Sequence, residues 1–189
     1  MQIGLLLSLA GHAPVQGAAP ADAAIAEVRR AYAQCREVQK QAPAIELHQR
    51  RKGEPPVRTW QRQEPPEDEQ GGRKMALFAF NGVVRSAIEE VDPISGDWQQ
   101  TVEHCFRDDG SVAFVLSVLR TFQGNVQVED RTYFNPGGER IRTLRQVSDL
   151  KTSKPLKPSE ASFRDRKPQL YPNAEDLLTA VGRENVFPR

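Results

Sequence analysis

The sequence predicts an α+β fold: an N-terminal helix packed on an antiparallel meander of about seven or eight strands, followed by a short C-terminal helix. Three observations predict it. They are a helical apolar stripe near the N-terminus, a hairpin motif that occurs at residues 104–116 and again at residues 132–144, and a capped helix near the C-terminus. In each copy of the motif an aromatic residue ends an extended run, a polar turn closes on a glycine, and a second extended run begins.

The glycines of the two motif copies, Gly110 and Gly138, stand at the same position in their turns. A three-residue hairpin loop needs a left-handed residue there, and glycine adopts that conformation without the strain that a Cβ atom would cause. A third hairpin is predicted at Asn81-Gly82, the dipeptide favoured in two-residue type I′ turns. The middle of the chain is therefore predicted to be a series of antiparallel hairpins.

Length and charge restrict the class of protein. The chain has 189 residues, 26 basic and 25 acidic, which fits a single domain over residues 22–189 and gives no overall attraction to nucleic acid. No apolar run approaches the roughly 18 residues that a membrane span needs. We therefore expect neither a nucleic-acid partner nor a membrane span.

The N-terminal segment predicts export. Residues 3–10 form a short apolar run, and residues 11–23 are rich in Ala, Gly and Pro, with small residues at several cleavage offsets. We expect residues 1–21 to be a signal peptide and the protein to be periplasmic or secreted, although the basic residues that usually begin such a signal are missing. A cytosolic chain with an apolar start is the alternative.

The first helix is predicted over residues 25–38, because apolar side chains recur there at spacings of three and four. It carries Cys35, and the second cysteine, Cys105, ends the strand that leads into the first repeated hairpin. In an oxidising compartment we expect the two to form a disulfide bond between helix and sheet. In a cytosolic protein they would be two buried, unpaired thiols.

Two strands are predicted before the hairpins, at residues 45–48 and 57–61, and a polar loop rich in Pro and Gly follows at residues 64–72. The strand at residues 112–119 is apolar on both sides. We therefore expect it to be central in the sheet, with the N-terminal helix covering its second face.

Pairing across the turns assigns side chains to the faces of the sheet. In the hairpin that turns at Gly110, a regular ladder would place Phe106, Phe114 and Leu116 on one face and Cys105 on the other. In the last hairpin the alternation slips between residues 143 and 144, which indicates a bulge there.

Arginine is concentrated on both sides of the last hairpin turn. Guanidinium groups on a sheet can bind carboxylate or phosphate, which makes this cluster a candidate anion-binding surface. Its residues are Arg131, Arg140, Arg142 and Arg145. The alternative is that these charges only protect an edge strand from aggregation and are neutralised by Glu129, Asp130 and Glu139.

The C-terminal part begins with a polar connection at residues 151–160 that contains Lys-Pro twice. A helix is predicted at residues 174–181, because Asn173 is a favourable N-cap and Gly182 can end it. Its apolar stripe is expected to lie on the sheet.

No catalytic, cofactor-binding or metal-binding signature is found in the sequence. The three histidines lack the spacing of zinc ligands, and the adjacent Asp108 and Asp109 lack the pattern of a calcium loop. We therefore predict a soluble exported binding or interaction module without catalytic activity or cofactor, whose partner is a protein or an anionic envelope ligand. The alternative is an envelope-associated hydrolase with His104 as base and Glu103 or Asp130 nearby.

The chain resembles a class of uncharacterised exported bacterial proteins in which a helix packs on an antiparallel sheet. The resemblance rests on Ala-Ile-Ala-Glu-Val-Arg-Arg-Ala-Tyr at residues 24–32, on the Tyr-Phe-x-x-x-Gly hairpin at residues 133–138, and on Asn-Ala-Glu-Asp-Leu-Leu at residues 173–178. The hairpins are also similar to those of MORN-type and YD-type β-repeats. The resemblance covers residues 22–182, and it implies a fold and a compartment but no activity.

Overall fold

The computed structural model describes residues 20–52, 57–62 and 72–187. The predicted signal peptide at residues 1–21 and the predicted loop at residues 64–72 lie outside the described residues, apart from their last positions.

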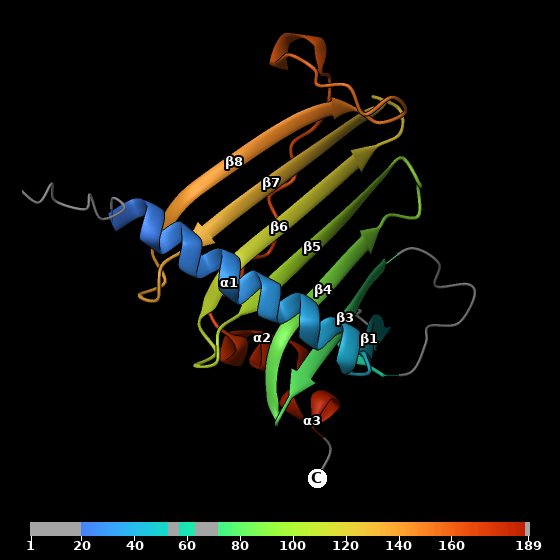
Figure 1. Cartoon of the computed structure of the whole chain (residues 1–189). Coiled ribbons are helices and arrows are strands. Elements are labelled where there is room, and N and C mark those ends of the chain that lie inside the picture. The colour runs from blue at the N-terminus through green and yellow to red at the C-terminus, as the bar shows by residue number, and fades with distance from the viewer. Residues whose placement is uncertain (1–19, 53–56, 63–71, 188–189) are drawn as a thin grey trace, which may run out of the picture.

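The described chain forms one antiparallel sheet with helices before and after it (Figure 1). Helix α1 (Pro20–Gln41) comes first. The strands are β1 (Ile45–Lys52), β2 (Val57–Gln61), β3 (Gly72–Phe80), β4 (Val83–Asp92), β5 (Trp98–Phe106), β6 (Val112–Thr121), β7 (Val126–Phe134) and β8 (Arg140–Asp149). Helices α2 (Ala174–Val181) and α3 (Arg183–Val186) end the chain. The predicted α+β class, with its N-terminal helix, meander and C-terminal helix, is confirmed.

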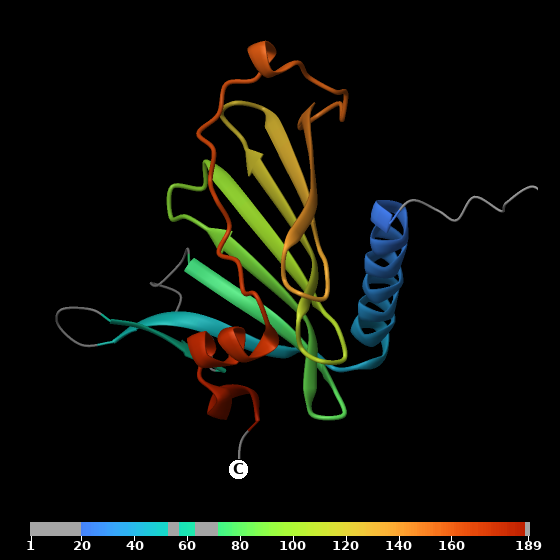
Figure 2. The same ribbon diagram turned by 90° about the vertical axis from the view of Figure 1, so that its left-hand side faces the viewer.

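The strands lie in the order β2-β1-β3-β4-β5-β6-β7-β8. Figure 2 shows α1 on one side of this sheet and, on the other side, the chain that follows β8 together with α2 and α3. We call the side under α1 the helix face and the opposite side the inner face. Residues 161–171, which we call the crossing segment, run along the inner face towards α2 (Figure 2).

The helix face is closed by an aromatic and aliphatic cluster. Val28 and Cys35 of α1 pack there with Cys105, Phe114 and Tyr133 of the sheet. The ring centroid of Phe114 lies 5.1 Å from that of Tyr133. Helix α1 therefore covers the second face of β6, as the sequence predicts.

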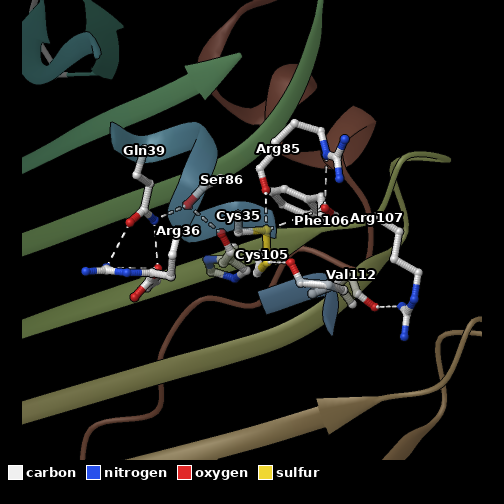
Figure 3. The surroundings of a disulfide bond; sticks show 12 residues. Cys35, Arg36, Gln39, Arg85, Ser86, Cys105, Phe106, Arg107 and Val112 are labelled. Atoms are coloured by element: carbon white, nitrogen blue, oxygen red, sulfur yellow. Dashed lines mark hydrogen bonds and ion pairs between the residues drawn. A yellow bond between two sulfur atoms is a disulfide. The ribbon is translucent and has the colours of Figure 1, made fainter. Parts of the chain in front are cut away.

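The predicted disulfide bond joins α1 to β5 at the centre of this cluster (Figure 3). Cys35 and Cys105 are both fully buried, their Cα atoms lie 5.9 Å apart, and 70 positions separate them in the chain. Beside the bond, the side-chain amide of Gln39 donates to Glu103 Oε1 and to Ser86 Oγ, each at 2.7 Å. The bond therefore fixes the position of α1 on the sheet.

The inner face holds the larger core. Met75, Leu77, Val102 and Phe106 of the sheet pack against the apolar stripe of α2, which includes Leu177. The sequence-predicted ends of α2 are confirmed. The side chain of Asn173 accepts a hydrogen bond from the backbone N–H of Asp176 at 2.8 Å, and Gly182, with φ 80°, ends the helix.

Each of the three predicted hairpins carries a β-bulge next to its turn. The register shifts between Phe78 and Ala79, between Cys105 and Phe106, and between Tyr133 and Phe134, so that one residue in each second strand has no partner. The unpartnered residues are Arg85, Ala113 and Ile141. The turn glycines predicted to be left-handed have φ 75° at Gly82, 82° at Gly110 and 79° at Gly138.

The bulges correct two predictions made from regular alternation. Because Ala113 is an extra residue, Phe114 pairs with Cys105 and lies on the helix face, whereas Phe106 lies on the inner face. The predicted common face for Phe106, Phe114 and Leu116 is therefore wrong. The bulge of the last hairpin falls at Ile141, earlier than the predicted slip between residues 143 and 144.

Candidate binding groove

The four arginines of the candidate anion-binding surface lie on two faces of the sheet. Arg142 pairs in register with Tyr133 and Arg131 with Leu144, which places both arginines on the helix face. Arg140 pairs with Phe134 of the inner core. Arg140 and Arg142 would share a face in a regular strand, but the bulge at Ile141 separates them.

On the helix face, Arg131 is already paired. Its Nη2 atom lies 2.6 Å from Glu129 Oε1, on the same strand. Arg142 is exposed. The structure therefore brings Arg140 and Arg145 together on the inner face, and places Arg131 and Arg142 elsewhere.

The inner face contains a groove between strands β6 to β8 and the crossing segment. Its volume is about 540 Å³. Val115 and Leu170 contribute apolar surface, and Thr132 and Thr143 contribute hydroxyl groups. The charged residues that line it are Asp130, Arg140, Arg145, Asp165, Arg166 and Lys167.

Arg145 connects the crossing segment to the sheet. Its Nε and Nη2 atoms donate to the two carboxylate oxygens of Asp130 at 2.7 and 2.6 Å, and its Nη1 atom donates to Asp165 at 3.1 Å. The hydrogen bonds to Asp130 and then those to Asp165 raise the pKa of the Arg145 guanidinium above its ordinary value. Both acidic side chains of the groove are therefore bound to this one arginine.

The crossing segment has two further attachments. The guanidinium of Arg166 lies over the ring of Trp98, with its Cζ atom 3.8 Å from the ring centroid. The side-chain amide of Gln100 donates to the carbonyl of Arg166 at 3.1 Å. These contacts hold the wall of the groove in place from the β5 side.

Two cations of the groove remain without compensation. Neither Arg140 nor Lys167 makes an ion pair with any residue that the structure describes. Since Arg145 binds both Asp130 and Asp165, the groove keeps an excess of positive charge at its walls. Such a site can bind a carboxylate, sulfate or phosphate group.

The residues of the alternative hydrolase site are separated in the structure. His104 is 1% exposed on the inner face, and its Nε2 atom accepts a hydrogen bond from the backbone N–H of Tyr171 at 3.3 Å. Burial lowers the pKa of His104 to about 4. Glu103 lies on the helix face, bound to Gln39. Asp130 shares the inner face but lies two strands away, which at ordinary strand spacing separates the Cα atoms by about 10 Å or more.

Sequence reasoning missed a carboxyl group on the inner face. Glu89 is 1% exposed, and the Nε atom of Arg73 donates to its Oε1 at 2.6 Å. Burial raises the pKa of Glu89. Its position opposite Val102 and Met75 follows from the β3-β4-β5 register, which the sequence pattern alone does not reveal.

Among the described residues, no group of three or more His, Cys, Asp and Glu side chains is placed to hold a metal ion. In the same part of the chain no helix has the length and apolar character of a membrane span. Comparison of the chain with protein-family models, with curated proteins and with solved structures finds no match. The function is therefore argued from the groove itself.

Proposed function

We propose that the protein is an exported binding module whose inner-face groove binds an anionic ligand. One observation carries the proposal: Arg140 and Lys167 line a cavity of about 540 Å³ without an ion-pair partner among the described residues, while Arg145 beside them is held by two carboxylates. Cations at the wall of a groove raise the local concentration of anions and can bind them through charge-assisted hydrogen bonds.

Two observations support a periplasmic or secreted location. The buried Cys35–Cys105 bond is of the kind that persists in oxidising compartments. The apolar run at residues 3–10 has the character of an export signal.

Binding is favoured over hydrolysis by the state of His104. A general base that works near neutral pH needs an accessible nitrogen and a pKa close to the operating pH. His104 is buried, its Nε2 atom is occupied by Tyr171, and burial lowers its pKa to about 4.

The test compares anion binding by the parent and by two charge-reversal variants. Dextran sulfate and polyglutamate serve as probes in calorimetric titrations at several salt concentrations. The Arg140→Glu/Lys167→Glu double variant should weaken binding at least about tenfold, and salt should weaken it in the parent, because screening acts over about 8 to 10 Å.

Arg142→Glu is the matched control, since Arg142 is exposed on the helix face and outside the groove. It should change the affinity less than about twofold. The proposal is wrong if neither probe binds in a salt-sensitive manner, or if Arg142→Glu weakens binding as strongly as the double variant does.

A further inference from the structure

We propose that the ligand of this groove is an extended acidic segment of a partner polypeptide, which adds to the open edge of β8 as an antiparallel strand. The inference rests on the proposed function, because it names the ligand of the same site. It is carried by the backbone of β8, by the position of the groove beside it, and by the charge of the strand.

β8 is the last strand of the sheet, and the chain itself already pairs with part of its outer edge. The N–H of Leu156 donates to the carbonyl of Val147, and the N–H of Asp149 donates to the carbonyl of Lys154, both at 2.9 Å. The bridge formed there is antiparallel. This part of the edge therefore accepts an antiparallel strand of residues 154–156.

None of the described residues pairs with the rest of this edge, residues 140–146, which we call the open edge. In an antiparallel strand every second residue directs its backbone N–H and C=O to the same side. Val147 uses its C=O and Asp149 uses its N–H on the outer side. The backbone N–H and C=O groups of Thr143 and Arg145 therefore point outward too. No described residue pairs with these outward groups of Thr143 and Arg145.

The groove lies next to this open edge. The side chains of Thr143 and Arg145 line the groove, whereas Arg142 and Leu144 lie on the helix face. A strand added about 4.8 Å from β8 would direct alternate side chains towards the groove and towards the helix face. Backbone pairing would then supply affinity and the groove would supply selectivity, as in other strand-addition sites.

The charge of the open edge selects the occupant. Residues 140–146 contain three arginines and no acidic residue. On the groove side an acidic strand would place a carboxylate near Arg140, which has no ion-pair partner among the described residues, and opposite charges across a ladder are stabilising. A second copy of β8 would bring three more arginines and no carboxylate to this edge, which adds like charge instead of compensating it.

Two apolar side chains at the edge also favour an occupant over simple protection from aggregation. Ile141 is 38% exposed and Leu144 is 37% exposed. Charges and bulges alone would protect an edge. An added strand would, in addition, cover these two side chains and satisfy the outward backbone groups of Thr143 and Arg145.

The test uses a capped synthetic peptide in which glutamate alternates with valine over a length matching residues 140–146. We expect it to bind, and we expect the backbone amide protons of Thr143 and Arg145 to become protected from hydrogen exchange in NMR spectra. Two N-methylated forms of the peptide, each methylated on every second amide, are the controls. One form should bind at least about tenfold more weakly, because it loses the hydrogen bonds to β8, and the other should bind like the parent peptide.

The outcomes separate this inference from the proposed function. Strand addition is wrong if both methylated peptides bind with equal affinity and the amide protons of Thr143 and Arg145 are not protected. If binding is still weakened by Arg140→Glu/Lys167→Glu in that case, the groove remains an anion-binding site. If the parent protein binds no anionic probe at all, both the proposed function and strand addition are wrong. Dimerisation of the protein through β8 would also overturn the inference, because the strand added to the edge would then be a second copy of β8.

Discussion

Arg107 and Glu27 form a two-point ion pair between the turn after β5 and helix α1. The Nε and Nη2 atoms of Arg107 lie 2.9 and 3.0 Å from the two carboxylate oxygens of Glu27. The same guanidinium donates to the carbonyls of Val112 at 2.6 Å and Phe134 at 2.7 Å. One side chain thus joins α1, the β5–β6 hairpin and the end of β7.

The first prediction concerns this guanidinium. Arg107→Met should lower the free energy of unfolding by about 3 kcal/mol, because it removes a buried charged donor and leaves two carbonyls and a carboxylate without it. Glu27→Gln is the control and should cost about 1 kcal/mol, since the Glu27 side chain is 32% exposed. Chemical denaturation measures both. Equal losses in the two variants would contradict the central role of Arg107.

The second prediction concerns the disulfide bond. The Cys35→Ala/Cys105→Ala variant should be less stable than the oxidised parent by about 4 kcal/mol, because the bond closes a loop of 70 positions in the unfolded chain. Alkylation without reductant followed by mass measurement reports the state of the thiols. Two alkylated cysteines in protein recovered from an oxidising compartment would show that the bond does not form there.

The third prediction concerns the left-handed turns. Gly110→Val and Gly138→Val should each cost about 1 to 3 kcal/mol, because a β-branched residue is strained at positive φ. A Cβ atom at Gly138 would meet nothing within 4 Å, so the cost there comes from the backbone alone. Gly138→Asn should cost less, because asparagine tolerates this conformation. Denaturation curves in which valine and asparagine variants coincide would refute the backbone explanation.

The fourth prediction is a pH dependence from His104. Burial lowers its pKa to about 4 in the folded protein, whereas the pKa of histidine in an unfolded chain is about 6.5. Below pH ~6.5 the unfolded chain binds a proton that the folded protein does not, so stability should fall as the pH falls towards 4, by about 3 kcal/mol in all.

The measurement is the difference in unfolding free energy between the parent and His104→Gln across this pH range. The neighbouring ionisable groups on the inner face are Tyr171 and Glu89, and burial raises the pKa of both. The raised pKa of Glu89 favours the folded protein as the pH falls, which is opposite to the effect of His104. Both are present in parent and variant, so the difference isolates His104. Parallel pH profiles would show that His104 does not titrate in this way.

The turns and caps were predictable because their chemistry is local. Gly110, Gly138 and Asn173 each meet a backbone requirement that is set by their immediate neighbours. The bulges were not predictable. Both faces of β6 are buried, so the apolar character of Phe114 does not show on which face it lies, and only the pairing with β5 shows that Ala113 is the extra residue. The same kind of shift at Ile141 separated Arg140 from Arg142.

The groove lay beyond sequence reasoning for a different reason. Its outer wall, the crossing segment, has no helical or strand periodicity, and its position depends on contacts with residues far away in the chain. Arg145 binds Asp165, and Arg166 lies over Trp98. Arg107 gave no signal either, because a charged residue before an Asp-Asp-Gly turn is ordinarily a solvated one.

The disulfide bond has a consequence for how the protein matures. The sequence has two cysteines, so within one chain a single pairing exists and no incorrect bridge has to be rearranged. Oxidation requires thiolate access, yet both sulfur atoms end up fully buried. Maturation therefore depends on an oxidant that acts before α1 settles on the sheet, and a disulfide isomerase has no substrate in the monomer.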